Sequence, residues 1–362
     1  MIAENALNYV DEDRVEVDID DAVDDQTLAI PRYSITSYGI DYDVAGLVRR
    51  LNNEEILIPG FQRGFVWSTA LMSRFIESLL LGLPVPGIFL YRMDDDRYQV
   101  IDGQQRVRTL QAYYAGNIDE RPFRLVRLDS TSEFEGLTYR ELVGSDRRRL
   151  DNSIIHATVV RQDKPDDNGS SKYSIFERLN TNVKPLSSQE IRTAIYQGDF
   201  NVLLLNLNEN HNWRSLFGKK HSRKRDEELI LRFLALYYES KGYKSPMKRF
   251  LNEFMSRNRY LEKQASERIQ TLFEATVETI LEKIGIRAFY LTRALNAALC
   301  DSIMVGIARR LEHGPIKSEI LTSYKELLKS QEYSDLIADT TSAPERVRAR
   351  IQLATDAFAD VE

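Results

Sequence analysis

A strand-like run passes directly into a helix-like one in the first third of this chain. Residues 98–101 are mostly apolar, Asp102-Gly103 interrupts them, and a helix-like segment, residues 107–115, follows at once. The unpaired N–H groups and the dipole at a helix start favour an anion, and Gly103 has no side chain to keep one from the backbone. Arg106 adds a planar cation. The sequence therefore predicts a strand–turn–helix unit that presents an anion site.

The rest of the front half alternates apolar runs with amphipathic ones. Apolar residues at helical spacing predict helices over 44–51 and 71–80, the second capped by Ser68 or Thr69. Residues 33–42 are a polar entry segment before the first of these helices. Strands are expected at the following ranges: 56–58, 88–91, 98–101, 123–128 and 154–161.

The rear half follows a helical pattern. Ser187 followed by Glu190 fits a capping box for a helix through Tyr196, and Gly198 is expected to end it. The clearest apolar stripe covers residues 269–284. We therefore expect an α+β front half and an all-α rear half, divided near residue 200.

Composition limits the classes of protein to consider. A chain of 362 residues with 43% hydrophobic content is globular and long enough for roughly two domains. Its one cysteine, Cys300, excludes an internal disulfide and a cysteine-built metal cluster. The longest apolar stretch, residues 79–91, holds two prolines and is shorter than the roughly 20 residues of a spanning helix. With no signal peptide expected, we predict a cytoplasmic protein without a membrane partner.

Charge is concentrated at the start of the chain. Residues 1–29 hold ten acids and one arginine, while the whole chain has a net charge of −6, so the remaining residues carry +3. Blocks of like charge are usually solvated, and we interpret this one as a flexible leader, residues 1–32. The alternative is an acidic arm that occupies a nucleic-acid groove until a polyanion displaces it.

Three segments combine charged or amide side chains with glycine or proline: 59–63, 102–106 and 176–180, the last followed by Glu190 and Arg192. Arginine binds phosphate oxygens in a bidentate manner, and Asp, Asn and Glu suit Mg²⁺. Together these segments describe a nucleotide or phosphodiester site. No G-x-x-x-x-G-K-[ST] motif occurs, which excludes a P-loop enzyme.

Three motifs resemble the N-terminal domain of GmrSD-type, modification-dependent restriction systems. They are Ile58-Pro59-x-Phe61-Gln62-Arg63, Ile101-Asp102-Gly103-Gln104-Gln105-Arg106 and Phe176-x-x-Leu179-Asn180-Thr181, the last followed by Leu186-Ser187-x-Gln189-Glu190-Ile191-Arg192. The resemblance covers roughly residues 40–240. Related defence proteins act on phosphorothioated DNA. The family is similar in fold to ParB and sulfiredoxin and is associated with NTP binding and hydrolysis coupled to DNA cleavage. It implies an α+β, ParB/sulfiredoxin-like N-terminal domain with a small mixed sheet, followed by an all-α helical C-terminal domain.

The resemblance also implies roles for individual residues. Those expected to be catalytic are Asp102, Gln104 and Arg106. Those expected to bind nucleotide or phosphate are Gln62, Arg63, Gly103, Gln105, Arg106 and Arg192. By similarity to the ParB nucleotide pocket, Asn180 and Glu190 are expected to hold Mg²⁺.

The chain departs from the larger members of the family in one respect. Their C-terminal HNH-type nuclease domain needs clustered histidines, and the four histidines here are scattered: His156, His211, His221 and His313. A separately encoded nuclease would then do the cutting. Arg214 and His221 fit an R-x₆-H ribonuclease pattern, but such loose spacing arises often by chance.

We therefore predict a leader (1–32), a ParB-like nucleotide-binding domain (33–200) and a helical domain (201–362). The predicted function is a nucleotide-binding, Mg²⁺-dependent NTPase-type sensor or regulatory subunit of an antiviral restriction system. Two alternatives are a nucleotide-gated DNA-binding module without turnover and a ParB-like DNA nuclease. DNA is an expected partner, and a homo-oligomer is a further possibility. One basic run is a candidate nucleic-acid contact: Lys219, Lys220, Arg223, Lys224 and Arg225.

Overall fold

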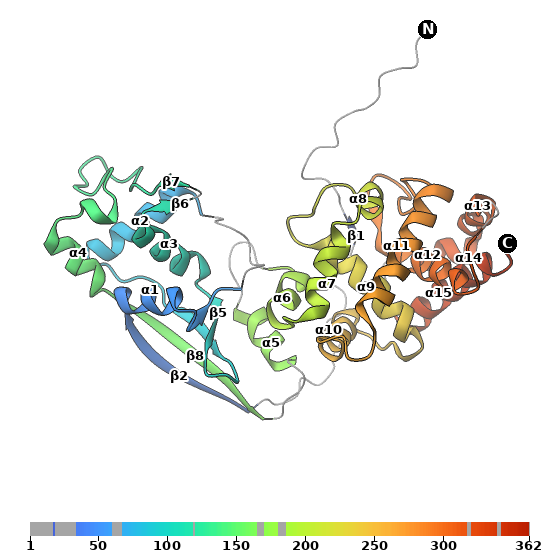
Figure 1. The fold of residues 1–362 in the computed structure, drawn as a ribbon, viewed down its shortest axis with the longest axis horizontal. Helices are drawn as coiled ribbons and strands as arrows, with labels where there is room; N and C mark the ends of the chain where they lie inside the picture. Colours follow the sequence, from blue (N-terminus) through green and yellow to red (C-terminus); the bar gives the residue numbers. More distant parts are fainter. Residues whose placement is uncertain are drawn as a thin grey trace, which may run out of the picture. The chain divides into compact units, whose positions relative to one another are not determined.

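The computed structural model describes residues 17–18, 34–59, 67–118, 120–164, 170–179, 186–316, 320–338 and 342–361. The chain divides into two compact units. The first, called the sheet unit, comprises Pro31–Asp167 and Ser171–Pro185. The second, called the helical unit, comprises Met1–Ile30, Asn168–Ser170 and Leu186–Glu362. The expected α+β front and helical rear are confirmed (Figure 1).

A mixed sheet of five strands organises the sheet unit. In spatial order the strands are β2 (Ser34–Asp43), β8 (Ile154–Lys164), β4 (Ile88–Arg92), β5 (Tyr98–Asp102) and β3 (Ile56–Leu57). β8 runs parallel to β4, and β5 runs parallel to β3, while the other two neighbouring pairs are antiparallel. The predicted hairpin at residues 93–97 joins β4 to β5. Both predicted strands that flank the candidate anion site are therefore present.

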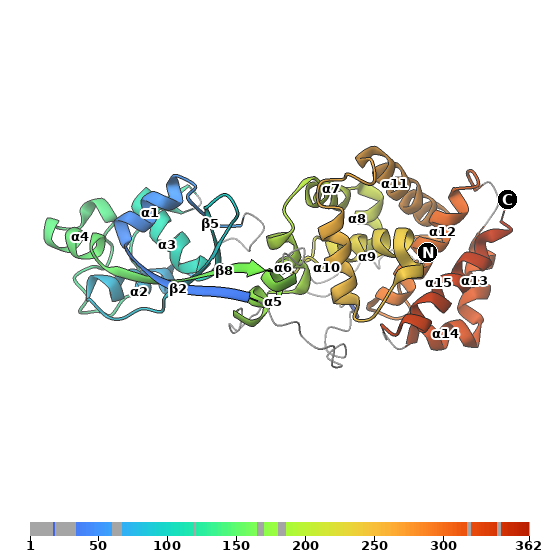
Figure 2. The ribbon, with the colours of Figure 1, turned by 90° about the horizontal axis from the view of Figure 1, so that it is seen from below.

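The sequence indicates only a polar entry segment at residues 33–42, whereas the structure makes residues 34–43 the strand β2. Its ten residues pair with β8 from Ser34 opposite Lys164 to Asp43 opposite Ile154 (Figures 1 and 2). The segment carries β-branched and aromatic residues that suit a pleated surface, among them Ile35, Thr36 and Tyr38. Its polar composition gave no strand signal, because an edge strand that is paired on one side need not bury a continuous apolar face.

Helices cover the sheet and complete the core of this unit. They are α1 (Val44–Asn52), α2 (Thr69–Leu80), α3 (Gln104–Ala115), α4 (Gly144–Asp151) and α5 (Ser170–Leu179), with the 3₁₀ helix η1 (Tyr139–Glu141). Ser68 caps α2 as predicted, through its Oγ and the Leu71 N–H. Leu47, Ile76 and Leu110 are completely buried against the strands. The 3.6-residue period of apolar residues thus correctly indicated which face of each of these helices packs into the core.

The strand predicted at residues 123–128 is wrong. No strand forms at these residues, and a small ribbon of two two-residue strands, β6 (Asn117–Ile118) and β7 (Arg121–Pro122), precedes them. Phe123 and Leu125 are buried, but the Leu125 N–H donates to the Leu137 carbonyl and the Val126 N–H to the Ser73 hydroxyl. The apolar residues of this run are there because they are buried in the core. Its backbone N–H groups bond to a loop carbonyl and a side-chain hydroxyl, so the run does not pair with the sheet.

The helical unit contains the remaining elements. Its helices are α6 (Ser188–Ile195), α7 (Asp199–Asn208), α8 (His211–Phe217), α9 (Arg225–Glu239), α10 (Met247–Arg257), α11 (Ser266–Lys283), α12 (Ala297–Leu311), α13 (Leu321–Lys329), α14 (Gln331–Ala338) and α15 (Pro344–Ala359), with the 3₁₀ helix η2 (Ser240–Gly242). A parallel ribbon pairs β1 (Val17–Asp18) with β9 (Leu295–Asn296). The buried α12 packs against α9, α11 and α15 (Figure 2). No helix among the described residues combines the length and hydropathy needed to cross a membrane.

Candidate functional site

The predicted strand–turn–helix junction is confirmed. β5 ends at Asp102, Gly103 is the N-cap of α3 with φ +91°, and α3 begins at Gln104. Among the described residues no side chain caps α3, and no acidic residue lies in its first turn. α1, α2 and α6, by contrast, each have a side-chain cap. The N-terminus of α3 therefore keeps a positive electrostatic potential that an anion can neutralise.

Gly103 is required by both backbone conformation and space. Its φ of +91° lies in the left-handed region, which residues with a Cβ rarely adopt. A Cβ added there would lie 2.5 Å from Ile88 Cγ2 and 3.1 Å from Arg106 Nη2. The absence of a side chain thus allows β4, β5 and Arg106 to converge on one point.

We expect Gly103→Ala to lower the free energy of unfolding by about 2 kcal/mol, because it combines left-handed strain with a clash against Ile88. It should also displace Arg106 and weaken any anion bound at α3. Urea denaturation measures the first effect and phosphate titration the second. Gly82→Ala is the matched control, since Gly82 has a φ of +72° with nothing within 4 Å of its added Cβ. Equal losses in both variants would show that strain alone, without the close approach, accounts for the result.

Asp102 and Arg106 form an ion pair one helical turn apart. Arg106 Nη2 lies 2.8 Å from Asp102 Oδ2 and donates a second hydrogen bond to the Gly87 carbonyl at 2.9 Å. Both side chains are largely buried, with 15% and 19% of their areas exposed for Arg106 and Asp102. Arg106 Nε is buried and has no hydrogen-bond partner among the described residues. Asp102 and the Gly87 carbonyl therefore orient a guanidinium that retains donor capacity.

Gln105 connects this junction to the first predicted motif. The Trp67 N–H donates to Gln105 Oε1 at 3.2 Å, so the chain that follows residues 60–66 reaches the first turn of α3. The chain before them, β3, runs parallel to β5 with Ile56 opposite Tyr98. Gln62 and Arg63 themselves lie outside the described residues. Their roles stay predictions; the residue that follows their segment contacts α3, and the strand that precedes it pairs with β5.

Two contacts at this junction were not predicted. The Gly87 carbonyl accepts from Arg106, and the Trp67 N–H positions Gln105. A sequence signal existed for the first, since the prolines before Gly87 indicate a stiff turn into β4. Trp67 also contributes to packing, because its ring lies edge-on against Phe75 with 5.7 Å between the ring centroids.

The third motif and the segment after it are divided between the two units: residues 176–181 are part of the sheet unit, and residues 186–192 are part of the helical unit. Asn180 lies outside the described residues, while α6 with Glu190 and Arg192 is part of the helical unit. The predicted capping box is confirmed: Glu190 Oε2 accepts from the Ser187 N–H at 2.7 Å, and Ser187 Oγ accepts from the Glu190 N–H at 3.1 Å. Glu190 therefore stabilises the start of α6.

Arg192 is completely buried and its guanidinium already has protein partners. Nε donates to Asn252 Oδ1 at 2.8 Å, and Nη1 donates to Gln189 Oε1 at 3.1 Å. Glu228 Oε1 lies 3.5 Å from the same Nη1. These contacts describe a structural role, and phosphate binding by Arg192 stays a prediction.

The described residues do not form a magnesium site. No group of three Asp, Glu, His or Cys side chains among them is placed to hold a metal ion. Glu190 is 1% exposed, and its Oε2 is used in the capping box. An ion ligand needs lone pairs that face a cavity, and the Oε2 lone pairs of this carboxylate are used by the Ser187 N–H. The Mg²⁺ role of Glu190 therefore lacks support from its geometry.

The basic run is only partly available to a polyanion. Lys220 pairs with Glu209, Lys224 with Glu227 at 2.6 Å and Arg225 with Glu228 at 3.1 Å. Lys219 and Lys220 are exposed, whereas Arg223, Lys224 and Arg225 are half-buried at the start of α9. Nucleic-acid contact by this run stays a prediction. The exposed Lys219 and Lys220 are better placed for it than the half-buried residues at the start of α9.

Arg214 and His221, which fit the R-x₆-H pattern, take part in a hydrogen-bond network. Arg214 Nη1 donates to Asp226 Oδ2 at 2.9 Å, and the His221 N–H donates to the same oxygen at 3.3 Å. His221 Nδ1 accepts from the Arg223 N–H at 3.1 Å, and burial lowers the pKa of His221. Each group thus serves to hold α8 and the start of α9 together.

Comparison with known proteins agrees with the motif pattern. Residues 44–197 match the family described as the GmrSD restriction endonuclease, N-terminal domain. The matched range includes the Gly103 junction and extends through α6. Neither the curated proteins nor the solved structures contain a match to the chain.

Proposed function

We propose that the chain is a nucleotide-binding sensor or regulatory subunit of a restriction system, a proposal supported by the match of residues 44–197 to the GmrSD restriction endonuclease N-terminal domain family. It binds an NTP, hydrolyses it, and acts together with a separately encoded nuclease on modified DNA. The observation that carries the proposal is the uncapped N-terminus of α3 behind Gly103, with the oriented Arg106 beside it.

These groups suit a phosphate chain. The N–H groups of the first turn of α3 are donors for phosphate oxygens, and Gly103 lets those oxygens come close. Arg106 neutralises charge on the transferring phosphoryl group, and Asp102 holds its guanidinium in place. Gln104, at the first position of α3, is the side chain suited to hold the attacking water, since a carboxamide can both donate and accept. Arg63 is proposed as a second cation, and Mg²⁺ as an ion that accompanies the triphosphate.

Phosphoryl transfer depends mainly on positioning and charge neutralisation, which these residues can supply. Water attacks the terminal phosphorus, the bond to the bridging oxygen breaks, and that oxygen leaves with the nucleoside diphosphate. The charge that builds on the phosphoryl oxygens is what Arg106 and the helix start would stabilise.

One panel separates this proposal from its two rivals. The purified chain is incubated with each of four NTPs and Mg²⁺, with and without modified DNA, and phosphate release, nucleotide binding and DNA nicking are measured. Release that is lost in Asp102→Ala and Arg106→Ala supports the sensor with turnover. Binding without release supports a nucleotide-gated DNA-binding module, in which the ligand only shifts a conformational equilibrium. Nicking by the single chain, lost in the same variants, supports a nuclease.

A further inference from the structure

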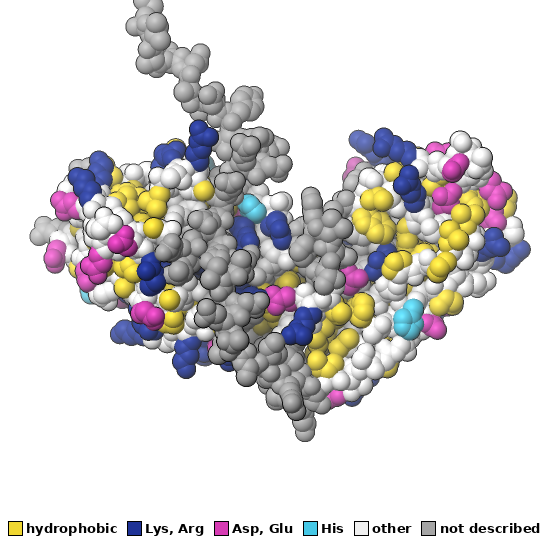
Figure 3. Space-filling model, turned by 180° about the vertical axis from the view of Figure 1, so that it is seen from behind, with side chains coloured by type: hydrophobic (Ala, Val, Ile, Leu, Met, Phe, Trp, Pro, Cys, Tyr) yellow, Lys and Arg dark blue, Asp and Glu magenta, His cyan; other side chains and the backbone are white. Residues whose placement is uncertain are grey.

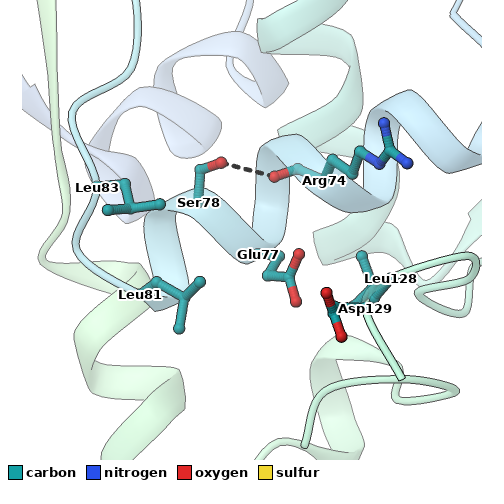
Figure 4. Close-up of a pocket in the computed structure, with 7 residues that line it drawn as sticks. All are labelled: Arg74, Glu77, Ser78, Leu81, Leu83, Leu128 and Asp129. Atoms are coloured by element: carbon teal, nitrogen blue, oxygen red, sulfur yellow. Dashed lines mark hydrogen bonds between the residues drawn. The ribbon is translucent and has the colours of Figure 1, made fainter. Parts of the chain in front are cut away.

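Two segments of the helical unit carry charge of one sign only. Over much of the surface, Lys and Arg side chains lie among Asp and Glu side chains (Figure 3). The hollow of about 400 Å³ at the end of α2 is an example, because Arg74 lines it together with Glu77 and Asp129 (Figure 4). Residues 211–225 and 285–296, by contrast, hold eight Lys or Arg residues and no Asp or Glu. A surface built from both segments would attract an anionic chain.

The two basic segments lie side by side. The Tyr290 hydroxyl donates to the Phe217 carbonyl at 3.3 Å, and the rings of Trp213 and Phe289 pack with 6.4 Å between their centroids. The exposed cations of both segments therefore belong to one region, called the basic surface: Lys219, Lys220, Arg287 and Arg293.

The two arginines of the basic surface have no acidic partner among the described residues. Arg287 donates to a backbone carbonyl at 2.7 Å, and its guanidinium lies 5.7 Å from the centre of the Tyr290 ring. Arg293 makes no hydrogen bond or ion pair within the described part of the chain. Lys220 does pair with Glu209, but these side chains are 59% and 60% exposed, and such ion pairs are weak. The basic surface thus has charge left for an anionic partner.

The acidic leader is attached at the same region. Its strand β1 pairs in parallel with β9, with Val17 opposite Leu295 (Figure 1). Leu295 also forms a β-bridge with Tyr290, the residue that joins the two basic segments. Because parallel strands run in the same direction, the chain before Val17 is expected on the side of the chain before Leu295, which carries Arg293. Four acids stand in that part of the leader: Asp11, Glu12, Asp13 and Glu16.

We propose that these four acids bind the basic surface and that DNA competes with them for it. The leader then occupies the place of a nucleic-acid backbone within its own chain. Single exposed ion pairs are weak, but the pairing of β1 with β9 makes these contacts intramolecular, at an effective concentration on the order of 1 mM, so several of them act together. The inference rests on the proposed function only in taking DNA as the competitor, and it does not involve the nucleotide chemistry at Gly103.

Carbodiimide cross-linking of the full chain, read by mass spectrometry, tests the contact. The reagent joins a carboxylate to a lysine amine as an amide, with the oxygen leaving on the urea product. Links are expected from residues 11–16 to Lys219 or Lys220 within one copy, and a Lys220–Glu209 link shows that this lysine reacts. The links to the leader should disappear at 1 M salt, where the Debye length is about 3 Å.

Charge reversal shows whether the basic surface holds the leader. Arg293→Glu should lower the yield of the leader links at least about threefold, because it replaces an attraction by a repulsion. The variant should fold normally, since Arg293 has no partner among the described residues, and thermal unfolding checks this. Arg121→Glu is the matched control, at an exposed arginine of the sheet unit, and should leave the yield unchanged.

Titration of a labelled DNA duplex at low salt measures the competition. Neutralising the four acids (Asp11→Asn, Glu12→Gln, Asp13→Asn and Glu16→Gln) should tighten DNA binding at least about fivefold, because the competitor is lost. Adding Arg293→Glu to this variant should remove the gain. The control makes the same change in net charge at four exposed acids elsewhere, converted to their amides, and should alter the affinity less than about twofold. These acids are Glu54, Asp94, Glu133 and Glu332.

Several results would overturn the proposal. One is the absence of leader links while the Lys220–Glu209 link forms. Another is leader links that join two copies, which a mixture of ¹⁵N-labelled and unlabelled chains reveals. A third is equal DNA affinity, or no DNA binding, in the wild type, the leader variant and the control. Failure to release phosphate from any NTP would instead end the proposed nucleotide chemistry and leave these measurements as they are.

Discussion

Arg106→Ala is expected to reduce phosphate release by about 10²–10³-fold, the loss typical of removing one preorganised group that stabilises transition-state charge. Nucleotide binding should weaken by about 1.5–3 kcal/mol, since a hydrogen bond to a charged group is lost. The guanidinium is the largest positive charge at the junction, and both Asp102 and the Gly87 carbonyl hold it in one orientation. Malachite-green detection of phosphate and titration of a fluorescent NTP measure the two effects.

Two further variants give this prediction its specificity. Arg106→Lys keeps the charge and loses the planar fork, so it should retain weak binding and recover only part of the release. Arg97→Ala is the matched control, because Arg97 pairs with Asp95 on the β4–β5 hairpin and is 45% exposed. Unchanged phosphate release in a folded Arg106→Ala protein would end the assignment of the NTP site to this junction.

Asp301→Asn is expected to destabilise the protein by about 3–5 kcal/mol, because breaking a buried ion pair leaves an uncompensated charge. Asp301, 1% exposed on α12, accepts from Arg232 at 3.0 Å (Nε) and 2.6 Å (Nη2). It also accepts from Arg350 Nη2 at 3.3 Å, so one carboxylate serves two buried guanidiniums. Burial lowers the pKa of Arg350, and Asp301 is the nearby charge that opposes this change.

Urea denaturation, followed with hydrogen exchange to locate the loss in α9, α12 and α15, measures this cost. Arg232→Met combined with Asp301→Leu should be less destabilised than Asp301→Asn, because it leaves one buried guanidinium, that of Arg350, without the Asp301 carboxylate, whereas Asp301→Asn leaves two. Asp95→Asn, which removes an exposed carboxylate paired with Arg97, is the control and should change little. An Asp301→Asn protein as stable as this control would contradict the prediction.

The candidate site could be predicted from the sequence where its signals are local. Gly103, the end of β5 and the start of α3 follow from residues within one turn of each other, and so does the Ser187–Glu190 capping box. The sequence predicts a functional role for Arg106, but its hydrogen bond to the Gly87 carbonyl depends on the residue just before β4, 19 positions away in sequence.

Residue type alone did not separate functional from structural polar groups. Glu190 and Arg192 share a motif with residues expected at the phosphates, yet they are buried in the helical unit. Arg192 contacts Asn252, which lies 60 residues further along the chain. A sequence pattern can single out a charged residue. Only the groups that surround that residue in the folded protein decide whether its charge stabilises the fold or binds a ligand.

From the sequence alone came the alternation of elements, the helix caps and the glycine turn, because turn chemistry, capping and apolar period act between residues close in the chain. Only the tertiary structure made residues 34–43 a strand, since the β8 residues that pair with them lie more than 100 positions away. It also placed residues 123–128 in an irregular loop with Phe123 and Leu125 buried, and joined Asp301 to Arg232 and Arg350. Strand pairing and the burial of charge depend on partners that local sequence does not specify.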